Sequence, residues 1–168
     1  TDRPSALALL ERVLVEAGGH PFVPAAIASG LYRREAAFLG QIAPRLGQLG
    51  ARPEVASVLT LVASALVRQG DQDQVRDLVG RIADRGGWPV WARLAALRGF
   101  EPLLRPDVRR QVGSLRIVRA ETLAPLTESA EAGVKALAGR IAAGLEREAA
   151  ADQRRAAEAR PLTAAERT

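Results

Sequence analysis

The sequence has no cysteine, no methionine and a single histidine, and each shortage excludes a kind of chemistry. Without cysteine the chain can form neither a disulfide nor a thiolate metal site, and it cannot attach haem covalently. His20 alone would have to supply any catalytic triad, general base or imidazole ligand, so no transition-metal site is expected. His20 lies between Gly19 and Pro21, where a capping or solvated role is expected. The missing methionine indicates a processed product or a fragment, and we expect a fragment.

Known catalytic motifs are missing as well. The sequence contains no Gly-x-Ser-x-Gly elbow, no phosphate-binding glycine-rich loop with lysine and no His-Glu-x-x-His zinc helix. Acidic pairs do occur, Asp71 with Asp73 and Glu146 with Glu148, but acids are common at helix starts, where they favour the dipole, and on ordinary surface. We therefore expect no enzyme, and no catalytic, cofactor-binding or metal-binding residue.

Long hydrophobic runs are also absent. The longest nearly uncharged run, Ala56 to Val67, is too short to span a bilayer and is broken by serine and threonine. The first residues lack the basic-then-apolar order of a signal peptide. We expect no membrane span, and any targeting segment would have to lie upstream.

Helix-forming residues dominate what the sequence does contain. Of its 168 residues, 48% are hydrophobic but only 4% aromatic, and alanine, leucine and arginine favour helices. No stretch alternates valine, isoleucine, threonine and aromatic residues as a strand would. A chain of this length can bury roughly 70% of the surface of its unfolded form, which suffices for a core without disulfides or metal. The predicted fold class is all-α.

Apolar residues recur at helical spacing along most of the chain. The clearest stripe predicts a buried helix that starts at Pro53 and ends near Gly70. Its members are Val55, Val58, Leu59, Val62 and Leu66. Asp71 is expected to cap the next helix, which ends at Gly86 and forms an antiparallel hairpin with the first. The other expected helices span residues 4–17, 21–30, 34–49, 89 to about 104, 121–129 and 131 to about 150, with an irregular stretch over 109–119.

Prolines recur at expected helix starts, at Pro21, Pro53 and Pro89, each followed by a valine-bearing apolar run. The spacings of 32 and 36 residues fall in the range of two-helix solenoid repeats. We therefore predict a HEAT- or armadillo-like solenoid of antiparallel helix pairs over residues 1–150, with an irregular helical bundle as the alternative. Residues 151–168 alternate charge and alanine, and we expect a linker to a downstream domain or an exposed helical extension.

The net charge is +5, and the basic residues are arginines except for Lys135. Residues 98–119 contain six arginines but only two acidic residues, Glu101 and Asp107. Those arginines are Arg98, Arg105, Arg109, Arg110, Arg116 and Arg119. With Trp88 they form the candidate interaction patch, for which we favour a solvated face over a phosphate-binding track. Trp91 is expected in the core between repeats, whereas the burial of Trp88 stays open.

Three segments carry a resemblance to a known family: His20 to Leu31 with the following Arg34-Glu35 and Phe38-Leu39, residues 88–104, and residues 160–167. They resemble the helical-repeat region of large secreted bacterial redox proteins. In those proteins a β-propeller similar to quinoprotein sugar dehydrogenases precedes a HEAT-like domain, and a c-type cytochrome follows it. The resemblance implies a periplasmic or secreted parent in which this domain spaces the propeller and the haem domain. It assigns no quinone or haem ligand to this chain.

Two hypotheses of function follow. The first is a non-catalytic scaffold, without a cofactor of its own, that docks the propeller-type dehydrogenase and the cytochrome c domain of the same chain for electron transfer. The alternative is a nucleic-acid-binding helical repeat that uses the arginines of residues 98–119 as a phosphate track and whose binding weakens steeply with salt. We favour the first, because arginine in place of lysine more often reflects coding bias than nucleic-acid binding. The oligomeric state stays open.

Overall fold

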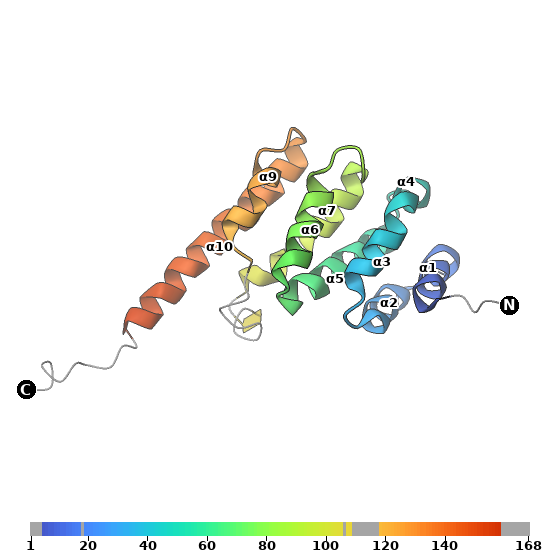
Figure 1. Cartoon of the computed structure of the whole chain (residues 1–168), viewed down its shortest axis with the longest axis horizontal. Helices are drawn as coiled ribbons and strands as arrows, with labels where there is room; N and C mark the ends of the chain where they lie inside the picture. Colours follow the sequence, from blue (N-terminus) through green and yellow to red (C-terminus); the bar gives the residue numbers. More distant parts are fainter. Residues whose placement is uncertain (1–4, 18, 106, 109–117, 159–168) are drawn as a thin grey trace, which may run out of the picture.

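The structure is a computed structural model that describes residues 5–17, 19–105, 107–108 and 118–158. Every regular element in these ranges is helical (Figure 1), so the predicted all-α fold class is confirmed for them. The elements follow one another along the long axis of the molecule, from α1 near the N-terminus to α10 near the C-terminus. Of the irregular stretch expected over 109–119, only Val118 and Arg119 are described, and neither is helical.

Prolines interrupt the first part of the chain. Its elements are α1 (Ala6–Ala17), α2 (Val23–Leu31), α3 (Glu35–Ile42), the 3-10 turn η1 (Ala43–Arg45) and α4 (Leu46–Leu49). The single helix predicted over 34–49 is therefore wrong. Pro44 breaks it, because its ring clashes with the carbonyl of Gly40 and it has no N–H to donate. α2 starts later than predicted, with Pro24 instead of Pro21 in its first turn.

The two middle helices lie close to their predicted bounds, with α5 at Pro53–Gln69 and α6 at Gln72–Ala83. The predicted stripe of α5 is buried, and Gly70 ends the helix in the left-handed conformation with φ 72°. The Asp71 carboxylate accepts hydrogen bonds from the backbone N–H groups of Asp73 and Gln74, which confirms its capping role. α6 ends before the predicted Gly86.

The C-terminal part again divides at prolines. Its elements are α7 (Val90–Arg98), the 3-10 turns η2 (Glu101–Leu104) and η4 (Ala120–Leu123), α9 (Ala124–Thr127) and α10 (Ala132–Glu158). The helix predicted to reach residue 104 stops at Arg98, because Pro102 cannot donate a hydrogen bond to the Arg98 carbonyl and its ring would clash there. Pro125 marks the change from η4 to α9, where one helix was predicted.

α10 is longer than the sequence pattern predicts. Its predicted stripe is buried and consists of Val134, Leu137, Ile141 and Leu145. Residues 151–158 continue the helix without a break, as expected for a helical extension, whereas the linker to a downstream domain stays a prediction. Alanine-rich sequence favours the helix even where no apolar stripe packs against the core. The rest of the expected linker lies outside the described residues.

The helices pack in two rows (Figure 1). In the first row α5 packs extensively against α2 on one side and α7 on the other, and α7 packs in turn against α10. In the second row α1 contacts α3, and α6 contacts α9. The rows meet through the pairs α1–α2, α3–α5, α6–α7 and α9–α10. The predicted hairpin of α5 with α6 is only a minor contact beside those that α5 makes with α2 and α7.

A glycine sets the separation of the two central helices. A Cβ atom on Gly99, just after α7, would lie 2.7 Å from the backbone nitrogen of Ser64 and 2.9 Å from the carbonyl oxygen of Thr60. The Thr60 hydroxyl also donates a hydrogen bond of 2.8 Å to the Ala95 carbonyl. Because backbone cannot move aside as a flexible side chain can, any larger residue at 99 would push α5 and α7 apart.

The two tryptophans differ in burial. Trp88 is 4% exposed and belongs to the core, whereas Trp91, which was expected in the core, is only half-buried. Trp88 lies in the turn before α7, where helical periodicity does not determine the direction of a side chain. Trp88, a member of the candidate interaction patch, is therefore shielded from solvent, and the patch itself stays a prediction.

Candidate interaction surfaces

A groove of about 520 Å³ lies between α10 and η2. We name it the α10 groove. Its lining residues are Glu101, Leu104, Gly139, Arg140, Ile141, Ala143 and Arg147. Four of these residues are small or apolar, and we call them the floor of the groove; the other three are charged. The described lining contains no nucleophile beside a base.

Two arginines of α10 lie along the groove. Arg140 and Arg147 are two turns apart, so both are on the same side of the helix, about 10 Å from each other along its axis. Arg140 pairs with Glu101 at 3.5 Å, but their side chains are 72% and 45% exposed, and such exposed pairs add little stability. Arg147 is exposed and has no hydrogen bond or ion pair within the described ranges. Both guanidinium groups are therefore accessible to an anionic partner.

Two glycines of α10 shape the groove. A Cβ atom on Gly139 would meet nothing within 4 Å, so the space above it is open. A Cβ atom on Gly144 would lie 2.5 Å from Cδ2 of Leu104, so α10 and η2 are in close contact there. Gly144 thus allows Leu104, a residue of the groove lining, to approach α10 closely, and the space at Gly139 is open.

A buried arginine holds the start of α10 in place. Arg93 of α7 is 1% exposed, and its Nε donates a hydrogen bond to the Ile82 carbonyl at the end of α6. Its Nη1 pairs with the Glu131 carboxylate at 2.9 Å, just before α10 begins. The Ser129 hydroxyl donates a second hydrogen bond to that carboxylate, at 2.7 Å. One side chain thus connects α6, α7 and the N-terminal end of α10.

The same contacts predict a loss of stability in acid. Hydrogen bonds from the Ser129 hydroxyl and then from Arg93 lower the pKa of Glu131 from its ordinary 4.5 to about 2. A carboxyl whose pKa is lower in the folded than in the unfolded chain stabilises the fold above pH 4.5, and this contribution disappears between pH 4.5 and about 2. Urea unfolding across this range should show that the free energy of unfolding falls less in acid for Glu131→Gln than for wild type. Ser129→Ala should also reduce this fall, because it removes one of the two hydrogen bonds. Parallel pH curves for wild type and Glu131→Gln would contradict the prediction.

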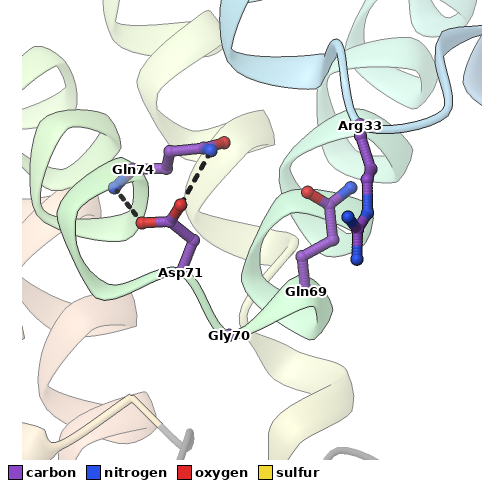
Figure 2. A pocket seen from close by; sticks show the side chains of 5 residues that line it. All are labelled: Arg33, Gln69, Gly70, Asp71 and Gln74. Atoms are coloured by element: carbon purple, nitrogen blue, oxygen red, sulfur yellow. Dashed lines mark hydrogen bonds between the residues drawn. The ribbon is translucent and has the colours of Figure 1, made fainter.

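A second cleft, of about 340 Å³, lies at the turn between α5 and α6 (Figure 2). Its lining residues are Arg33, Gln69, Gly70, Asp71 and Gln74. Arg33 and Gln69 lie on one side, and Asp71 and Gln74 lie on the other, joined by a hydrogen bond of 2.9 Å. All the side chains are polar. Small-molecule sites are mostly apolar, so this cleft does not resemble one.

The charged groups of this second cleft already have local explanations. The backbone N–H of Gln74, above all, lowers the pKa of Asp71, so that carboxylate serves the N-terminus of α6. Arg33 has φ 62°, which is uncommon for a residue other than glycine, and lies in the turn after α2 with its side chain exposed. It makes no ion pair within the ranges the structure describes. The cleft is a polar turn surface.

The arginines of the candidate interaction patch are placed only in part. Arg98 ends α7, Arg105 follows η2, and Arg119 precedes η4, and all three are exposed. Arg105 pairs with Asp107 at 3.5 Å. The remaining members of the patch lie outside the described residues: Arg109, Arg110 and Arg116.

His20 lies just before α2, and the two acidic pairs lie at the start of α6 and on α10. His20 is exposed, its ring centre lies 5.6 Å from that of Phe22, and its backbone carbonyl accepts a hydrogen bond from Val23 at the start of α2. Asp71 caps α6, and Glu146 is exposed on α10. Within the described ranges, no group of three or more histidine, aspartate and glutamate side chains is arranged to hold a metal ion.

The α10 groove was not predicted from the sequence. The available signal was the spacing of Arg140 and Arg147, seven residues apart with small residues between them. The other wall could not be anticipated, because η2 follows α7 in the sequence and reaches α10 only through tertiary packing. Arg93 was missed too, since an arginine within a helix is expected at the surface.

Comparisons of the chain with protein-family models, curated proteins and solved structures give no match. Over the described residues, no helix combines the length and apolar character needed to cross a membrane. A functional assignment must therefore rest on the residues of this chain and on their arrangement.

Proposed function

We propose that this chain is a HEAT-like helical-repeat scaffold that docks other protein segments and catalyses no reaction itself. The supporting observation is the packing of α2, α5, α7 and α10 one against the next in a row, with α1, α3, α6 and α9 each packed beside one of these helices. In helical repeats each unit contacts only its neighbours, and the stack offers an extended surface to partners. The helix α10, which lines the α10 groove, lies at one end of this arrangement (Figure 1).

Within that role we propose a redox setting, in which the scaffold spaces a dehydrogenase-like propeller and a cytochrome c domain in a periplasmic or secreted protein. The support is the resemblance of residues 20–40, 88–104 and 160–167. The first two of these regions belong to α2–α3 and to α7 with η2, next to the central helix α5. A stiff row of helices would hold an electron donor and an acceptor at a fixed separation.

Hydrogen exchange of the native chain should therefore reveal graded stability. The central helices α5 and α7 have packed neighbours on both sides, so their amides should be the most protected. α1 should exchange at a lower free energy, because it ends the row and leaves Leu9 and Val13 47% and 40% exposed. The measurement is native-state exchange followed by mass spectrometry of peptides from each helix.

Two outcomes would overturn the proposal. If all the helices exchange with one common free energy of opening, the molecule unfolds as a single cooperative bundle, and the proposed helical-repeat architecture is wrong. If the purified chain oxidises sugars with an artificial electron acceptor, or binds haem, the non-catalytic role is wrong. The expected result is graded exchange among the helices, with neither turnover nor haem binding.

A further inference from the structure

We propose that the α10 groove binds an acidic amphipathic helix of a partner segment. This inference rests on the proposed scaffold function and specifies the class of partner that one of its surfaces takes. Three properties of the groove support it: an open mouth, a floor of small and apolar residues, and two accessible arginines at a helical spacing.

The floor suits a helix laid beside α10. Helix axes approach to about 8–10 Å depending on the side chains at the contact, and small residues allow the closest approach. Gly139 and Ala143 are the small residues of the floor, and Leu104 is half-buried beside them. A partner helix could therefore place leucine or alanine side chains over Gly139, where no atom would meet even a Cβ.

The charges of the groove specify acidic residues on that helix. Arg140 and Arg147 are separated by two helical turns, so carboxylates two turns apart on a partner helix would face both. Arg147 makes no ion pair within the described ranges, and the ion pair of Arg140 with Glu101 is long and exposed. A partner carboxylate can therefore replace Glu101 at little cost, because the pair it displaces is weak.

An acidic peptide fits this groove better than a nucleic acid. The described lining of the groove holds two arginines, fewer than the roughly 6–10 phosphate contacts of a typical nucleic-acid interface. The apolar floor would also remain uncovered by a phosphate backbone, whereas the apolar side of an amphipathic helix would bury it.

The test uses the full chain and a synthetic helical peptide. The labelled peptide carries glutamates two turns apart with leucine and alanine between them. A control peptide has lysine in place of each glutamate. Fluorescence anisotropy should show saturable binding of the acidic peptide that weakens with salt, and no binding of the lysine peptide.

Charge reversal identifies the arginines involved. Arg140→Glu and Arg147→Glu should each weaken binding about tenfold or more, since each puts a carboxylate opposite the glutamates of the peptide. Arg76→Glu is the matched control: Arg76 lies on α6, is 71% exposed and also pairs with an acid, Asp73. It should bind the peptide as the wild type does.

A third variant blocks the groove without touching the core. Gly139→Leu should fill the open space and weaken binding about tenfold or more, while the unfolding temperature stays the same or rises, because glycine is a poor helix former. Gly80→Leu on α6 is its control, since a Cβ there also meets nothing within 4 Å. Gly80→Leu should leave binding unchanged.

Absence of peptide binding would overturn the inference, as would binding that survives Arg140→Glu, Arg147→Glu and Gly139→Leu. Binding of duplex DNA, lost in the arginine variants, with no binding of the acidic peptide would also overturn it and would identify a phosphate track. Hydrogen exchange separates the two proposals. Graded exchange without peptide binding would contradict this inference alone, whereas uniform exchange would contradict the scaffold.

Discussion

Arg93→Ala should lower the free energy of unfolding by about 3 kcal/mol or more. Arg93 is 1% exposed, and its guanidinium supplies both the hydrogen bond to the Ile82 carbonyl and the ion pair with Glu131. Alanine would leave the carbonyl without this donor, remove the cation from the Glu131 carboxylate, and open a cavity among α6, α7 and the start of α10. These losses act on one site, so we expect a single large effect.

Urea unfolding of the variant and two comparisons would test this. Arg93→Lys should lose less than Arg93→Ala but should not restore wild-type stability, because an ammonium group cannot reproduce the fixed fork of a guanidinium. Arg98→Ala, an exposed change in the same helix, should stay within about 0.5 kcal/mol of wild type. If Arg93→Ala loses less than about 1 kcal/mol, the buried link does not exist in solution.

Trp88→Ala should cost about 3–5 kcal/mol, the range for removing a large ring from a core. Trp88 is 4% exposed and lies among the core residues, so its removal leaves a cavity next to the start of α7. Trp91→Ala is the matched comparison. Trp91 is half-buried against the same core, so its loss should be clearly smaller.

The two tryptophan variants can be compared by urea unfolding at one temperature. Each variant keeps one tryptophan, so its fluorescence reports the environment of the ring that remains. The remaining ring of Trp91→Ala should emit at shorter wavelength than that of Trp88→Ala, because Trp88 is shielded from water. A larger loss for Trp91→Ala than for Trp88→Ala would show that the first turn of α7 faces the opposite way.

Local rules explain where the sequence alone succeeded. α5 was predicted from Pro53 to Gly70 because a first-turn proline, an apolar stripe and a terminal glycine agree with one another. The Asp71 cap and the buried stripe of α10 follow from equally local signals. The prediction of a continuous helix was wrong at Pro44 and Pro102. There the apolar spacing continues, but proline interrupts the helix, which is also a local rule.

The amino-acid sequence by itself thus determined the all-α class and most helix positions, because helix formation depends on residues within a few positions of one another. Only the tertiary structure decided that Trp88 is buried instead of Trp91, that Arg93 is inside, and that η2 lies against α10 to form a groove. Each of these features depends on which surfaces meet across long stretches of chain. The 3.6-residue period places a side chain on a helix face, but it does not specify the element that will cover that face.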